Sequence, residues 1–343
     1  MASLGELHDD GSMPVALLLP ALAIVLVGMA LALSQFCMVR AVLGVRDGVL
    51  SPARCVLAIS LAIALCLQLL AESRGGETMP TYSPQVPVLL GGLLFGIAAR
   101  ANGGCFIGTT NELCRGHGRR VLTVAGWVLG YALLRRSPLP SHAQRPMELA
   151  LVLIALVVLL LALELWASWR RQPFEPNPAI PWLHGRRAWG LMLSSGVLMG
   201  VLHHSGLPWH PSSLARALGQ ALSGEPLPAD TPSALLLLLG MAMVQGWRGQ
   251  IQPQGLSWSD LPLLFWGTLM GIGAVWGMGA NDGYLFRSLP LGSLHAAAGL
   301  AAMTAGILLP LRWPTWMLAV APWPSRSAGA AGAAAAQGPQ TGG

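Results

Sequence analysis

The chain has no lysine among its 343 residues, and only 10% of the residues are charged. Soluble domains carry about 25% charged residues, so this composition excludes a water-soluble globular protein. The lack of lysine also excludes a Walker-type phosphate-binding loop, which needs one. The five cysteines form no CxxC pair and no Cys/His cluster, which argues against a structural zinc site or a disulfide framework. We therefore expect a chain that does not hydrolyse ATP, holds no metal or other cofactor, and is not an enzyme.

Apolar residues dominate the composition. They make up 54% of the chain, and the mean hydropathy is +0.59. They form long runs, which suit a lipid bilayer. The net charge of +6 comes from arginines in the short segments between these runs, so it indicates membrane topology and not a nucleic-acid partner. The sequence thus predicts an all-α, polytopic membrane protein that contacts membrane lipid.

Nine apolar stretches are candidate transmembrane helices, with short re-entrant helices among them. A clean span needs roughly 20 residues, because a helix rises about 1.5 Å per residue and the hydrocarbon core is about 30 Å thick. Several of the stretches are shorter or rich in glycine, which predicts broken helices. Such helices must be lined by protein, since lipid cannot satisfy their free backbone groups. The predicted spans are 14–33, 53–71, 86–104, 121–134, 148–167, 189–203, 234–247, 261–277 and 294–312.

The arginines predict an orientation. They gather between the first and second spans, between the fifth and sixth, and after the last. The positive-inside rule then places the N-terminus outside and the C-terminus inside a bacterial-type inner membrane. The expected parts are a polar N-terminal segment (1–13), a first membrane half (14–169), an Arg-rich cytoplasmic linker (170–188), a second membrane half (189–321) and a disordered Ala/Gly-rich tail (322–343).

An internal repeat relates the two halves. At an offset of 175 residues without gaps, glycines match glycines in four places, namely Gly92 with Gly267, Gly96 with Gly271, Gly104 with Gly279 and Gly108 with Gly283. Four predicted spans lie between the two copies, so the copies run in opposite directions through the membrane. This is the inverted pseudo-symmetry of many secondary transporters, whose binding sites form where the repeats meet.

The first copy carries the densest group of candidate functional residues. Its apolar helix breaks at Gly103-Gly104, where glycine allows another backbone or a ligand to approach closely. Cys105 sits at the break, and Gly108-Thr109 can begin a following helix whose N–H groups would attract an anion. Cys105 is either such a functional thiol or a small buried hydrophobe. The other candidates here are Arg100, Asn102 and Thr110, and Arg100 has the alternative of a structural pairing or of reaching the membrane interface.

The second copy has Ala280 in place of Cys105, followed by Asn281 and Asp282. An aspartate in this position either caps a helix or belongs to a path for protons or coupling ions. Cys37, at the end of the first apolar run, either lines a pore or packs. The remaining three cysteines have no comparable surroundings and are expected to pack.

At these residues the sequence resembles the YeeE/YedE family, the sulfur-transport membrane proteins that include thiosulfate uptake proteins. The most specific segment is Asn102-Gly103-Gly104-Cys105-Phe106-Ile107-Gly108-Thr109. The segments Gly271 through Leu285 and Leu289-Pro290 to His295-Ala296 also match, and the elements Phe36-Cys37 through Arg40 and Pro208-Trp209 are looser matches. The resemblance implies nine spans in pseudo-symmetric halves, with short re-entrant helices that meet at the centre.

The resemblance also implies a mechanism. Thiosulfate transporters of the family pass the anion along spaced cysteines by S–H···S hydrogen bonds, and Cys37 and Cys105 would be two such stations. Residues 115–343 contain no cysteine, so a related sulfur species is an alternative substrate.

We therefore expect transmembrane uptake of a small sulfur-containing anion, with helix N-termini and the side chains of Asn102, Thr109 and Thr110 as donors to its oxygens. A small cytoplasmic sulfur-carrier protein is an optional partner. The alternative function is a membrane sulfur-relay subunit that carries a transient persulfide on a reactive thiolate to a partner enzyme. The predicted substrate path comprises Cys37, Arg100, Asn102, Gly103, Gly104, Cys105, Gly108, Thr109, Thr110, Asn281 and Asp282.

Overall fold

A computed structural model gives the structure of the chain. It describes residues 13–309 apart from 71–80, 83, 135–142, 145–148, 181, 207–208, 223, 225 and 228–230. The predicted tail at 322–343 and all but the last residue of the polar segment at 1–13 lie outside the described residues.

The described residues are predominantly helical, which confirms the all-α class. Two-residue strands β1 (Thr81–Tyr82) and β2 (Ala143–Gln144) form a single antiparallel pair. The first half has the helices α1 (Met13–Leu33), α2 (Met38–Arg46), α3 (Ser51–Leu70), α4 (Val86–Asn102), α5 (Phe106–Cys114), α6 (Arg120–Leu134) and α7 (Leu149–Trp169). The second has α8 (Gly185–His204), α9 (Pro211–Leu222), α10 (Thr231–Trp247), η2 (Trp258–Asp260), α11 (Pro262–Trp276), α12 (Asn281–Gly283), the π-helical turn η3 (Tyr284–Ser288) and α13 (Leu294–Leu308).

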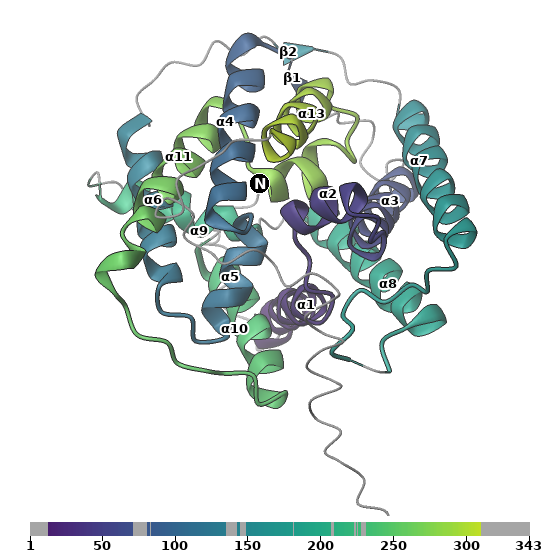
Figure 1. Cartoon of the computed structure of the whole chain (residues 1–343), viewed down its shortest axis with the longest axis horizontal. Helices are drawn as coiled ribbons and strands as arrows, with labels where there is room; N and C mark the ends of the chain where they lie inside the picture. The colour runs from purple at the N-terminus through teal and green to yellow at the C-terminus, as the bar shows by residue number, and fades with distance from the viewer. Residues whose placement is uncertain are drawn as a thin grey trace, which may run out of the picture.

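Several helices are apolar enough to cross a membrane. By length and composition, five helical stretches of the described residues qualify, and three shorter apolar helices accompany them. Helix α7 exposes most of its leucines and valines, as a helix that faces lipid does. In Figure 1 it lies at the edge of the molecule beside α3, its packing partner. These helices make the chain a multi-pass membrane protein.

Short helices join several pairs of long helices. A short helix joins two long ones in α1–α2–α3, α4–α5–α6 and α8–α9–α10, and the turns α12 and η3 join α11 to α13. The long helices pair across the two halves: α1 packs against α10, α3 against α8, α4 against α13, and α6 against α11. Figure 1 shows α4 next to both α11 and α13.

Glycines at these crossings show how the paired helices run. In three of the pairs, contacts advance along both helices in the same direction, so the pairs are parallel: Gly92 and Gly96 of α4 meet Gly299 and Met303, Gly126 and Gly130 of α6 meet Leu264 and Thr268, and Gly196 and Gly200 of α8 meet Ile59 and Ile63. Helices α4 and α11 are antiparallel, because Gly91 meets Gly277 whereas Phe95, further along α4, meets the earlier Gly273.

The loop at 170–184 marks one face of the molecule, which we call the linker face. Helix α1 ends there, because Asn177 Nδ2 donates to Leu33 O at 3.0 Å. Helix α3 begins there, because Ser51 Oγ donates to Pro173 O at 3.2 Å. Since α2 joins α1 to α3, it belongs to the linker side of the molecule.

Helix α5 also belongs to the linker side. Arg248, just after α10, donates to Ala179 O at 3.1 Å, so α10 ends on this face. The loop after α10 pairs with the loop after α5, where Gln252 N donates to Arg115 O at 2.8 Å. Helices α6 and α11 follow these loops and begin on the linker face. Helices α8 and α11 therefore both leave the linker face, and the short elements that follow them, α9 and α12, lie toward the opposite face.

Glycine at a crossing is needed because a side chain there would meet backbone. A Cβ at Gly96 would lie 2.1 Å from Met303 O, whereas a Cβ at Gly190 of α8 would meet no atom within 4 Å. We expect Gly96→Ala to lower the free energy of unfolding by about 1–3 kcal/mol through overpacking. Gly190→Ala is the matched control and should leave it unchanged or raise it by up to about 1 kcal/mol. Thermal unfolding of the detergent-solubilised protein checks this, and equal melting temperatures for the two variants would contradict the close crossing.

Candidate functional site

The break after α4 is built from two glycines and a cysteine. Gly103 ends the helix in the left-handed conformation, with φ of 77°, which glycine adopts without strain. Gly104 N then donates to Ala99 O at 3.0 Å, which satisfies one of the last carbonyls of the helix. Cys105 follows in extended conformation as the N-cap residue of α5. The predicted break is thus present at the predicted residues.

Two cysteines meet at this break. Cys37 is the N-cap residue of α2, as Cys105 is of α5. Their Sγ atoms lie 3.6 Å apart, and both side chains are buried. The backbone N–H of Met38 donates to Cys105 Sγ at 3.4 Å. The starts of two helices of nine residues each therefore converge on one pair of thiols.

Gly108 allows the two short helices to approach so closely. A Cβ at this position would lie 2.8 Å from Cys37 Sγ and 3.9 Å from Cys105 Sγ. The first of these distances is shorter than real Cβ contacts. Gly108, which the sequence singled out, thus shapes the space beside the thiols.

Asn102 fastens the break with its side chain. Its Nδ2 donates to Gly104 O and to Thr109 Oγ1, both at 2.9 Å. Its Oδ1 accepts from Thr123 Oγ1 at 2.8 Å and from Arg120 at 3.1 Å. The amide thereby uses both of its donors and both lone pairs, so Asn102 holds α4, α5 and α6 together.

The two threonines of α5 differ in their surroundings. Thr109 is fully buried and accepts the bond from Asn102. Thr110 donates within its own helix, to Phe106 O and Ile107 O. The hydroxyl of Thr110 is therefore already engaged in the structure.

Arg100 lies in the last turn of α4, and its side chain reaches from there to the end of α13. It donates to the carbonyls of Ile307 and Leu309 at 2.6 and 3.0 Å. These carbonyls close the C-terminus of α13, where a positive charge is favourable. These contacts agree with the alternative that Arg100 has a structural partner.

The structure brings Asn281 and Asp282 to α9. Both side chains are completely buried, and Ala280 precedes them as the N-cap residue of α12. Asp282 Oδ2 accepts from the backbone N–H of Ser212 at 2.9 Å, near the start of α9. These two candidates thus belong to a second polar group, toward the face opposite the linker.

A histidine that sequence reasoning missed belongs to this group. His210 directly precedes α9 and is 7% exposed. Its ring lies 5.0 Å from that of His203 and 4.9 Å from that of Trp209, measured between centroids. A signal for it exists, since an aromatic residue and a polar residue precede a short helix both in Trp209-His210 and in Phe36-Cys37.

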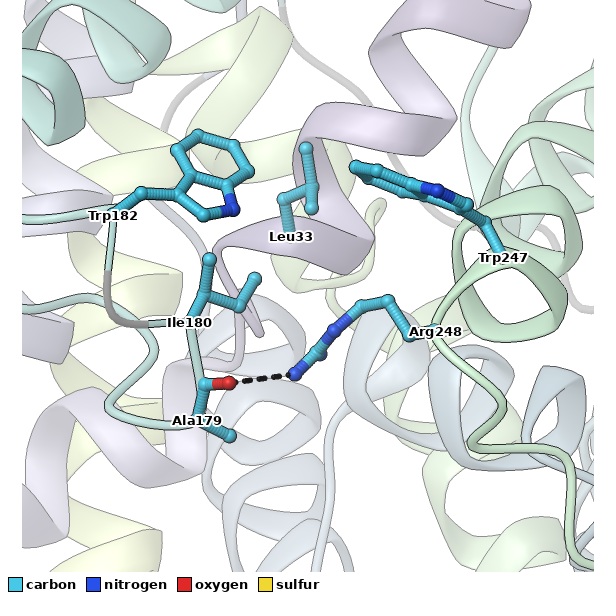
Figure 2. Close-up of a pocket in the computed structure, with 6 residues that line it drawn as sticks. All are labelled: Leu33, Ala179, Ile180, Trp182, Trp247 and Arg248. Carbon is cyan, nitrogen blue, oxygen red and sulfur yellow. Dashed lines mark hydrogen bonds between the residues drawn. The ribbon is translucent and has the colours of Figure 1, made fainter.

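A surface pocket lies apart from both groups. It has a volume of about 230 Å³ and is lined by Leu33, Ala179, Ile180, Trp182, Trp247 and Arg248. Figure 2 shows the two tryptophans flanking Leu33, with the guanidinium of Arg248 directed at Ala179 O. The lining contains none of the residues that we predicted from the sequence for the substrate path.

The fold and the buried thiol pair define a multi-pass helical membrane protein with polar groups in its interior. The sulphur transport family matches residues 33–225, more than half of the chain, and the chain belongs to this family, which is the YeeE/YedE family. The match includes Cys37, Cys105 and His210, and it ends before Asn281. No curated protein matches the chain.

The distance between the thiols predicts their oxidation to a disulfide. The Sγ atoms need to close from 3.6 Å to about 2.05 Å. Two equivalents of the Cu(II)–phenanthroline complex take up one electron each, and each thiol loses one proton. We expect peptide mapping by mass spectrometry to find a Cys37–Cys105 disulfide that is absent from Cys37→Ser. A disulfide between other cysteines, or none after exhaustive oxidation, would contradict the described arrangement.

Proposed function

We propose that the protein carries a small sulfur-containing anion, similar to thiosulfate, across the membrane past the thiols of Cys37 and Cys105. Membership of the sulphur transport family supports sulfur transport in general. The observation that carries the finer proposal is the thiol pair, with 3.6 Å between two buried sulfur atoms at the starts of two short helices.

The chemistry of the pair suits a sulfur anion that must enter and leave. Thiols are weak donors, and the starts of α2 and α5 add the partial positive charge of a helix N-terminus. The thiols act in their protonated form, because a thiolate would repel the anion. Weak donors that follow one another along the path replace part of the hydration shell of the anion without trapping it.

We propose further that the two membrane halves, 14–169 and 189–321, are related as an inverted repeat with nine crossing helices. The helix pairs support this, because exchanging α1 with α8 and α3 with α10 turns the α1–α10 contact into the α8–α3 contact, and the pairs α4–α13 and α11–α6 exchange in the same way. The antiparallel contact of α4 with α11 fits the same exchange. The nine helices are α1, α3, α4, α6, α7, α8, α10, α11 and α13.

The arginines support the orientation. The helix ends and loops of the linker face carry Arg46, Arg54, Arg115, Arg119, Arg120, Arg170, Arg171, Arg186, Arg187 and Arg248. By the positive-inside rule this face is cytoplasmic in a bacterial inner membrane. The segment 170–188 is then the cytoplasmic linker, and a small sulfur-carrier protein would receive sulfur at this face.

The persulfide-relay alternative is less well supported. A carrier cysteine must present a reactive thiolate to its partner. Cys37 and Cys105 are 4% and 0% exposed, so a partner enzyme does not reach them in this conformation. Uptake by the purified protein alone in liposomes separates the two functions.

Replacing Cys105 tests the proposed function. In proteoliposomes, we expect Cys105→Ser to lower the initial rate of ³⁵S-thiosulfate uptake at least about tenfold, because a hydroxyl is a harder and smaller group for the terminal sulfur than a thiol. Cys114→Ser is the matched control, since Cys114 donates to Leu238 O and serine can donate in its place. The control should transport normally.

Two measurements secure the interpretation. Both variants must elute as a single peak with the melting temperature of the wild type, so that lost uptake is not lost folding. A panel of sulfate, sulfite, selenite and hydrosulfide defines the preferred anion. Wild-type uptake rates in a folded Cys105→Ser protein would rule out the thiol path.

A further inference from the structure

The residue before α9 occupies the place in the second half that Cys37 occupies in the first. Cys37 follows Phe36 and precedes α2, whereas His210 follows Trp209 and precedes α9. Helix α2 belongs to the linker side, and α9 lies toward the opposite face. A passage from that face to the linker face would therefore meet the imidazole before it meets the thiols.

An aromatic contact chain joins the two places. The ring of Phe286 on η3 lies 5.0 Å from the ring of Phe36 and 5.7 Å from the ring of Trp209, between centroids. All three side chains are buried. One continuous apolar wall thus runs from the residue before Cys37 to the residue before His210.

Three buried side chains in or near α9 and α12 have polar atoms without a partner in the residues that the structure describes. Within the described part of the chain, neither ring nitrogen of His210 has a hydrogen bond, and neither the Nδ2 nor the Oδ1 of Asn281 has one. The indole Nε1 of Trp209 is also without a partner there. His210 is 7% exposed, and Asn281 and Trp209 are 0% exposed. Buried polar atoms are nearly always hydrogen-bonded, so such a group calls for water or a ligand.

The short elements near His210 carry two arginines and one carboxylate. Arg216 belongs to α9, which begins directly after His210, and Arg287 belongs to η3, which follows α12. Asp282 gives one oxygen to Ser212 N, and its other oxygen has no partner among the described residues. The arginines favour an anion at this place, whereas the carboxylate limits how tightly the anion is held and so helps its release.

We propose that His210, Asn281 and the indole of Trp209 form an oxyanion station that holds the oxygen atoms of the cargo before its terminal sulfur reaches Cys37 and Cys105. This inference rests on the proposed function and deepens it. Imidazole, amide and indole N–H groups suit oxygen acceptors, whereas thiols suit sulfur. The preferred substrate is therefore an anion that has both ends, an oxyanion group and a terminal sulfur atom.

Uptake kinetics test the station. In proteoliposomes with ³⁵S-thiosulfate, we expect His210→Ala to raise the KM about tenfold, since it removes a hydrogen bond to a charged acceptor. His210→Gln keeps an N–H donor and should recover part of the affinity. His184→Ala is the control, because His184 is an exposed histidine on the linker face, and it should leave the KM unchanged.

Competition separates a binding role from a structural one. Sulfate has oxygen atoms but no terminal sulfur, and hydrosulfide has sulfur but no oxygen. In His210→Ala we expect inhibition by sulfate to weaken about tenfold, and in His210→Gln we expect it to weaken by less, whereas inhibition by hydrosulfide should stay as in the wild type in both variants. A histidine that only supports the fold would change both alike.

The outcomes for the two sites are distinguishable. If Cys105→Ser lowers uptake at least about tenfold while His210→Ala matches the wild type in KM and in sulfate inhibition, the oxyanion station is wrong and the thiol path stands. If Cys105→Ser transports normally, the proposed function itself fails, whatever His210 does. Should His210→Ala not insert or fold, the glutamine variant decides by the same two measurements.

Discussion

An α-helix that stops inside a membrane leaves backbone N–H and C=O groups that lipid cannot satisfy, and the interior of this protein depends on meeting that demand with its own atoms. At the break after α4, the hydrogen bond from Gly104 N to Ala99 O closes the helix end. Asn102 then fastens the loop to α5 and α6. Because these bonds are made within the protein, the chain can turn back at Cys105 and bring a second helix start to it.

Close packing of the long helices encloses these breaks. At several crossings glycine lets the backbones touch, as where Gly91 meets Gly273 and Gly277. A partly buried ion pair ties α7 to the rest of the first half, with Arg54 NH2 on α3 bound to Glu164 at 2.6 Å. The long helices are thus held together by contacts far from the thiols, so the residues around the break need not supply all of the stability of the fold.

The sequence predicted those features that depend on neighbours along the chain. The all-α class follows from the apolar runs, and the break follows from Gly103-Gly104 with Cys105 directly after it. The glycine repeat also has a local signature. Gly96 packs on α13 and its match Gly271 packs on α6, so each half shows the same spacing.

Other features depend on which segments meet in space, and the sequence alone did not give them. Asn102 was expected among the donors to the anion, yet its hydrogen bonds go to residues of α5 and α6 and to Gly104. Arg100 reaches α13, which lies about 200 residues further along the chain. His210 was not predicted as a site residue. Its role depends on its contacts with Trp209 and His203 and on the neighbouring α12, and no short motif encodes that arrangement.

Helix α7, at the edge of the molecule, determines how the two halves are oriented relative to each other. Apart from α7, each half has four long helices, and an even number of crossings returns the chain to the side where it started. The single extra crossing of α7 makes the count odd before α8 begins. Under the inverted arrangement proposed above, α7 is therefore what turns the second half over. A chain without it would thread both halves with the same polarity, and the short helices α2, α5 and α9 and the turns α12 and η3 would all lie toward one side of the bilayer.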